Sequence, residues 1–133
     1  MKVEGQCHCG QISFEAEIDP NTVRICHCTD CQTLSGSAYR VSVPAPAASF
    51  RLLKGQPKIY VKTAESGNAR AQAFCSNCGS SIYSAATRET PTYALRVGTL
   101  KQRAQLQPTC QIWSRSAQPW VEDLRHVQQV ERQ

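Results

Sequence analysis

The chain has 133 residues, of which 41% are hydrophobic and 7% aromatic, so its core must be small and partly polar. This length is typical of one domain, and we expect a single domain over residues 1–133. The net charge of +5 is scattered without a basic block or interleaved aromatic residues, which makes nucleic acid an unlikely partner.

Short β-strands dominate the predicted elements. Residues 11–18 alternate apolar and polar side chains, as a strand with one buried face does, with apolar positions at Ile12, Phe14, Ala16 and Ile18. Six further strands are expected over residues 39–43, 50–53, 58–62, 70–74, 81–84 and 93–97, separated by turn residues such as Pro, Gly and Asn. Strands this short and this regularly punctuated predict a mainly β domain, a sandwich or barrel of antiparallel strands.

Two segments have helical character. Residues 29–35 open with Thr29 and Asp30 directly after Cys28, which is typical of the start of a helix of one or two turns. Near the C-terminus, apolar residues recur at helical spacing and predict a short tail helix; they are Val121, Leu124, Val127 and Val130.

Eight cysteines are the most informative feature of the chain. They form the groups Cys7-x-Cys9, Cys26-x-Cys28-x-x-Cys31 and Cys75-x-x-Cys78, with Cys110 left over. Such spacing suits a tetrahedral zinc ion, because one tight turn can supply two sulfurs about 2.3 Å from the metal. Residues 1–10 lack the apolar run of a secretory signal, and no apolar stretch is long enough to span a membrane. We therefore expect a cytoplasmic protein that binds metal, rather than a secreted disulfide scaffold.

The outer cysteine pairs predict one complete four-sulfur site. Cys75 and Cys78 lie between two expected strands, at the tip of a hairpin, and a glycine follows each outer pair, so backbone N–H groups can turn toward the sulfurs. Together with Cys7 and Cys9 they would fill the zinc tetrahedron and leave no room for substrate, which makes this site structural. The alternative is a set of buried free cysteines. His8 is not expected to bind the metal, because neighbours on a strand point to opposite faces.

Cys26, Cys28 and Cys31 predict a second zinc site with three protein sulfurs. Three ligands and an open position are typical of a catalytic zinc ion, and an incoming thiol suits such a position because zinc lowers its pKa. Two alternatives stay open. The fourth ligand could be His27, Cys110 or another distant side chain, and Cys110 in that position would make this site structural too. Alternatively, Cys28 and Cys31 could form a redox dithiol.

Several residues outside the cysteine groups could orient a thiol substrate. Each of them can equally be an ordinary loop, strand or packing residue. They are Ser35, Ser37, Tyr39, Arg40, Arg96 and Trp113.

Taken in order, these motifs resemble the glutathione-dependent formaldehyde-activating enzyme (GFA) family, whose members have an Mss4-like β fold. The resemblance runs from about Val3 to Trp120. It is carried by Gly5-Gln-Cys7-His-Cys9-Gly10, Cys26-His-Cys28-Thr-Asp-Cys31, Cys75-Ser-Asn-Cys78-Gly79, Gly98-Thr-Leu100, Ile112-Trp113 and Pro119-Trp120.

This resemblance implies two zinc ions per chain. One would be a structural zinc on Cys7, Cys9, Cys75 and Cys78, and the other a catalytic zinc on Cys26, Cys28 and Cys31. It also implies a carbon–sulfur lyase activity in which formaldehyde joins the thiol of glutathione to give S-hydroxymethylglutathione. This chain has Lys101-Gln102-Arg103 where relatives often carry acidic residues, and Gln111 where they often carry histidine.

Two other functions compete with this one. The first is a non-catalytic zinc-binding module that docks onto a protein or a nucleic acid, with both metals structural. The second is a zinc-stapled sulfoxide reductase with Cys110 as its catalytic residue, but the Cys-x-Cys groups match its paired Cys-x-x-Cys pattern poorly.

Overall fold

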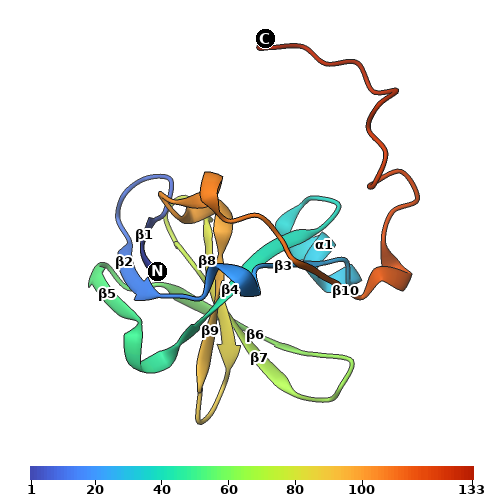
Figure 1. The fold of residues 1–133 in the computed structure, drawn as a ribbon. Helices are drawn as coiled ribbons and strands as arrows, with labels where there is room; N and C mark the ends of the chain where they lie inside the picture. Colours follow the sequence, from blue (N-terminus) through green and yellow to red (C-terminus); the bar gives the residue numbers. More distant parts are fainter.

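The computed structural model describes residues 1–133 as a mainly β protein of ten strands (Figure 1). The strands are β1 (Lys2–Gln6), β2 (Ser13–Glu17), β3 (Arg24–Cys26), β4 (Arg40–Pro46), β5 (Arg51–Lys54), β6 (Lys58–Thr63), β7 (Ala69–Phe74), β8 (Ser81–Ala86), β9 (Thr92–Arg96) and β10 (Cys110–Ile112). One α-helix, α1 (Thr29–Ser35), connects β3 to β4. No helix has the length and apolar character that crossing a bilayer requires.

The strands form two sheets. The smaller sheet has the order β1-β2-β5, and the larger has the order β10-β3-β4-β9-β8-β7-β6. Every pair is antiparallel except β10 and β3, which run parallel at the edge of the larger sheet. In Figure 1 the strands of the smaller sheet lie on one side of the molecule, and α1, β3 and β10 lie on the other.

A single apolar cluster joins the two sheets. The predicted apolar face of β2 and its flanks is confirmed, because the four alternating residues from Ile12 to Ile18 are at most 5% exposed. They belong to the same cluster as Val43 of β4 and Leu95 of β9, which lie opposite each other in the larger sheet. One face of the larger sheet therefore packs against the core, and its other face does not contribute to this apolar cluster.

The sequence predicted most of these elements. All seven expected strands are present, and α1 covers the residues predicted to be helical. The strands β1, β3 and β10 were not predicted, because two of them have three residues each and β1 contains a glycine, so none carries a clear alternation.

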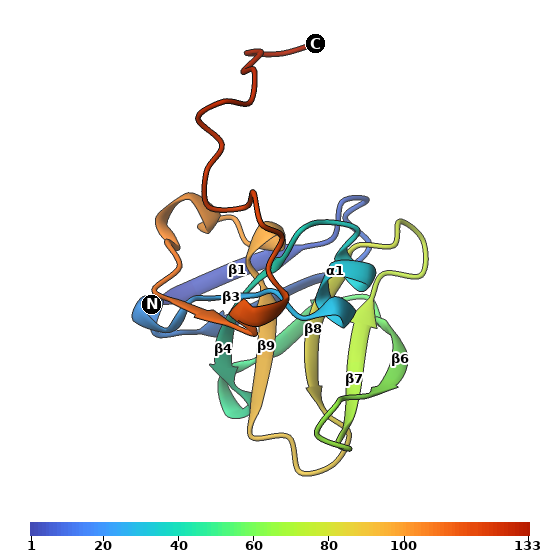
Figure 2. The same ribbon diagram turned by 90° about the vertical axis from the view of Figure 1, so that its right-hand side faces the viewer.

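The predicted tail helix is wrong. Beyond Ser116 the chain makes only isolated turns, such as the one in which the N–H of Val127 donates to the carbonyl of Leu124, and it leaves the body of the protein (Figures 1 and 2). Leu124, Val127 and Val130 are exposed. A helix this short is marginal unless its apolar side packs against a partner surface, and the tail has none.

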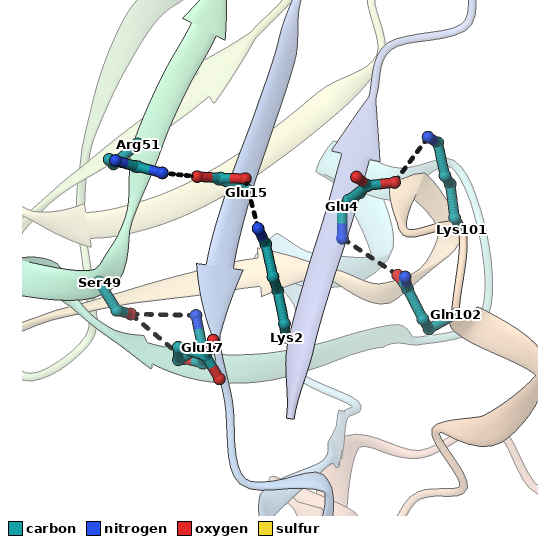
Figure 3. A network of polar contacts seen from close by, with 8 residues as sticks. All are labelled: Lys2, Glu4, Glu15, Glu17, Ser49, Arg51, Lys101 and Gln102. Carbon is teal, nitrogen blue, oxygen red and sulfur yellow. Dashed lines mark hydrogen bonds and ion pairs between the residues drawn. The ribbon is translucent and has the colours of Figure 1, made fainter.

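Ion pairs link neighbouring strands of the smaller sheet, in addition to its backbone hydrogen bonds (Figure 3). Glu15 of β2 pairs with Arg51 of β5 on one side and with Lys2 of β1, at 3.1 Å, on the other. Lys101 pairs with Glu4 of β1 at 2.7 Å. The basic segment that departs from the family pattern thus contacts β1, and none of its residues contributes to a cysteine group.

Gly5 of β1 lies beneath the ring of Phe14. The two residues are direct partners in the β1–β2 register, and a Cβ atom on Gly5 would lie 2.2 Å from Cζ of Phe14. Since Phe14 is fully buried, its ring cannot move into solvent. We expect Gly5→Ala to lower the free energy of unfolding by about 1–3 kcal/mol, measured in urea. Gly98→Ala, whose Cβ would meet nothing within 4 Å, is the control, and equal losses in the two variants would contradict this account.

Candidate metal centres and the adjoining cavity

The outer cysteine pairs meet as predicted. Cys7 and Cys9 lie in the connection between β1 and β2, and Cys75 and Cys78 lie in the turn between β7 and β8. All four Sγ atoms are within 4.8 Å of one another, with 3.6 Å between Cys7 and Cys9 and 3.7 Å between Cys9 and Cys75. Sulfurs held tetrahedrally about 2.3 Å from zinc are themselves about 3.8 Å apart, and both of these distances are close to that value.

Local hydrogen bonds contact two sulfurs of this four-sulfur group and favour the thiolate form of Cys78. The backbone N–H of Ile12 donates to Sγ of Cys7 at 3.2 Å. The Ser80 hydroxyl lies 3.2 Å from Sγ of Cys78, and hydrogen bonds from the Ser80 side chain and backbone lower the pKa of Cys78 to about 5. A thiol with so low a pKa is ready to bind a cation at neutral pH.

Ser80 should therefore set how well the four-sulfur group resists acid. Protons compete with metal for a thiolate, and a depressed thiol pKa favours metal until the pH falls through the folded-state value, here about 5. In Ser80→Ala the pKa of Cys78 should rise, so the midpoint of metal release should move to higher pH by roughly half a unit. Zinc released to a chromogenic chelator during acid titration measures this midpoint. Ser76→Ala, at an exposed position of the same turn, should leave the midpoint unchanged.

The second cysteine group forms where β3 leads into α1. Cys26 ends β3, Cys28 caps α1, and Cys31 lies in its first turn, where its N–H donates to Sγ of Cys28 at 3.3 Å. The three Sγ atoms are within 4.8 Å of one another, and all three residues are half-buried. A hydrogen bond between the thiols of Cys31 and Cys26 lowers the pKa of Cys26 and raises that of Cys31, so Cys26 loses its proton first.

The structure does not bring Cys110 or His27 to this three-sulfur group. Cys110 is exposed on β10, opposite Arg24, and its thiol points to the carbonyl of Gln111 at 3.8 Å. His27 is buried, with Nε2 2.7 Å from Oε1 of Gln111 and its ring edge-on to Tyr39. No fourth cysteine, histidine or carboxylate joins the group, and the side-chain oxygen of Gln111 is hydrogen-bonded to the imidazole of His27.

A cavity of about 250 Å³ adjoins the three-sulfur group. Its walls include the three cysteines, Leu34 of α1 and Trp113, and its floor is the face of the larger sheet that does not join the core. Strand register builds this floor, because Arg40 lies opposite Cys26 and Ser42 lies opposite Arg96. In Figure 2, α1 lies in front of β8 and β7, over the strands that supply the floor.

The cavity is strongly basic. No aspartate or glutamate lines it, while five cationic side chains do: Arg24, Arg40, Lys62, Arg70 and Arg96. Burial, followed by the nearby charge of Arg40, lowers the pKa of Arg96 to about 9. A cavity of this kind attracts anions.

The sequence had identified part of this cavity. Arg40, Arg96 and Trp113 were candidates for substrate contact, and the structure brings all three together beside the cysteines. The other three candidates line an adjoining cavity of about 520 Å³ that shares Arg40 and Arg96; they are Ser35, Ser37 and Tyr39. Sequence reasoning missed four residues, namely Arg24, Lys62, Arg70 and Gln72, because only the strand register shows that they share one face. The only sign of the three basic ones in the sequence was that basic residues recur at polar positions of successive strands.

Together, the fold and the two cysteine groups define a small β domain that could hold two metal ions. The family model described as glutathione-dependent formaldehyde-activating enzyme matches residues 2–116. The chain therefore belongs to this family, as its motifs predicted.

Among solved structures, the chain is similar to a structural-genomics crystal structure of a Rhodobacter sphaeroides protein. The two share 20% sequence identity and a TM-score of 0.63 over 81% of this chain and 98% of that chain, a likeness that supports the fold. No match was found among curated proteins.

Proposed function

We propose that this protein is a zinc-dependent carbon–sulfur lyase that joins a small thiol of the glutathione type to an aldehyde of the formaldehyde type, and that it also runs the reverse reaction. Family membership supports this class of substrates. The observation that carries the proposal is a three-sulfur group with no fourth protein ligand, open to a cavity. A four-sulfur group elsewhere in the same chain makes a useful contrast, since it offers no open position.

In this proposal the two groups hold zinc for different reasons. Cys7, Cys9, Cys75 and Cys78 would hold a structural ion, and Cys26, Cys28 and Cys31 would hold the catalytic one. All the ligands are thiolates, which suit zinc and a soft sulfur substrate. A zinc ion on three thiolates would lower the pKa of an incoming thiol and favour its thiolate form.

The chemistry is an addition without redox change. The substrate sulfur attacks the carbonyl carbon, a carbon–sulfur bond forms, and the carbonyl electron pair moves to oxygen, which takes up the proton that the thiol lost. The reverse reaction breaks the same bond. The chain contributes by fixing the reacting groups beside the cysteines, and such positioning is a large part of many catalytic accelerations. A cytoplasmic location, which we also propose, would keep the ligand thiols reduced.

Adduct formation tests the proposal directly. Glutathione and formaldehyde combine without a catalyst, so the measurement is their exchange rate by NMR with and without zinc-loaded protein. We expect the wild-type protein to accelerate exchange and Cys28→Ala to lose at least about 100-fold of that acceleration. Cys110→Ala should keep it. Equal exchange rates with and without protein, while both metals stay bound, would instead favour a non-catalytic zinc module.

A further inference from the structure

We propose that the cavity beside the three-sulfur group is a carboxylate-binding site and that the thiol substrate is an anion. Its carboxylate binds Arg40 and Arg96 while its sulfur reaches the centre formed by Cys26, Cys28 and Cys31. The sulfur end of this inference rests on the proposed function, whereas the carboxylate end rests on the arginines.

Arg40 and Arg96 are buried cations without a counter-ion. They are 6% and 8% exposed, and neither forms an ion pair. Arg96 donates to the hydroxyl of Ser42 at 2.9 Å and to Oε1 of Gln72 at 2.9 Å, and Arg40 donates to the same Gln72 oxygen at 3.3 Å. These partners are neutral. Nη2 of Arg40 and Nε of Arg96 have no partner at all, and a bound water, ion or ligand is one explanation for buried donors in this state.

The surplus of positive charge exceeds what the cysteines would balance. Three thiolates around a divalent zinc ion leave one net negative charge, which a single guanidinium would offset. The cavity holds four arginines, none of them in an ion pair, and its one lysine, Lys62, is paired with Asp30 at 2.8 Å. The remaining charge faces a partly enclosed space, where a ligand carboxylate would meet the planar, forked donors that arginine offers to such groups.

The spacing of the strands suits one small molecule that bridges both ends. Arg40 lies directly across from Cys26 on the neighbouring strand, and Arg96 lies one strand further. Neighbouring strand backbones are about 4.8 Å apart, so the side chains of Arg40 and Cys26 leave from adjacent points on one face, within reach of one small ligand that carries a sulfur and a carboxylate. The adjoining cavity that shares both arginines leaves room for the rest of a larger thiol.

Three probes of similar size separate the two ends of the ligand. They are 3-mercaptopropionate, which has both groups, 3-mercaptopropionamide, which keeps the sulfur but is neutral, and butyrate, which keeps the carboxylate but lacks sulfur. Binding to the zinc-loaded full chain is measured by calorimetry. We expect the wild-type protein to bind the mercapto acid at least about tenfold more tightly than its amide.

The variants Arg96→Gln and Arg40→Gln test whether the arginines cause this preference. In each variant, the preference for the mercapto acid over its amide, measured as the ratio of their affinities, should fall to about threefold or less. Butyrate should also bind more weakly than it binds the wild-type protein. Arg88→Gln removes the same charge from an exposed position outside the cavity and should keep the wild-type ratio. Thermal unfolding checks that each variant is folded. If Arg96→Gln does not fold, the result for Arg40→Gln tests the inference.

The outcomes distinguish this inference from the proposed function. If the acid and the amide bind equally tightly, or if their ratio persists in both arginine variants, the carboxylate site is overturned while the metal–thiol proposal stands. If the mercapto acid binds no better than butyrate, sulfur contributes nothing and the proposed function fails. In that case a loss of butyrate binding in the arginine variants would still support the anion site.

Discussion

Freshly purified, reduced protein is expected to carry two zinc ions per chain, and Cys31→Ala is expected to carry one. The seven clustered cysteines form a four-sulfur and a three-sulfur group, and removing one of three sulfurs leaves too few ligands for a stable site. Metal analysis after desalting measures the ratio. Added glutathione should speed exchange of the ion at the three-sulfur group, because only that group has room for a further ligand.

Cys110→Ala is the matched control for this experiment. Its thiol is exposed and lies outside both groups, so the variant should keep two zinc ions. Loss of an ion from Cys110→Ala, with no effect of glutathione on either site, would show that both coordination spheres are closed by the chain, and the catalytic assignment would then fail.

Cys75→Ala is expected to destabilise the protein strongly. Cys75 is 1% exposed, and its sulfur belongs to the group that ties the β1–β2 connection to the β7–β8 turn. Structural zinc contributes roughly 10–16 kcal/mol of apparent binding free energy in zinc-finger peptides, which equals or exceeds the usual stability of a whole domain. We therefore expect the variant to lose its cooperative thermal transition or to melt at least about 15 °C below the wild-type protein.

Circular dichroism during heating, with and without a chelator, measures this effect. Chelation of the wild-type protein should reproduce the behaviour of Cys75→Ala, and Cys31→Ala should melt close to the wild-type temperature. A Cys75→Ala protein that unfolds like the wild-type protein would show that the four-sulfur group has no structural role.

Local sequence patterns predicted the structure correctly where residues close in the chain determine it. The alternation from Ile12 to Ile18 fixed the buried face of β2, and the spacing of Cys75 and Cys78 between two strands predicted a metal group at a hairpin tip. The tail helix failed because periodicity gives a helix one apolar side but does not provide the surface on which that side must pack.

The cavity could be predicted only in part, because it is a product of strand pairing. Arg24, Arg40, Arg70 and Arg96 come from four different strands, and their shared face follows from the order of the larger sheet. In the sequence each looks like an ordinary polar position of a half-buried strand. The burial of Arg40 and Arg96 without a counter-ion becomes visible only when those strands are assembled.

The two cysteine groups differ in how much of the chain each one spans. The four-sulfur group joins segments 66 residues apart, whereas the three-sulfur group lies within residues 26–31, from the end of β3 to the first turn of α1. We therefore expect loss of an ion from the three-sulfur group to disturb only the residues near it. Under the proposed function, zinc shortage that empties only the three-sulfur group would stop the reaction without unfolding the chain, and returning metal would restore it.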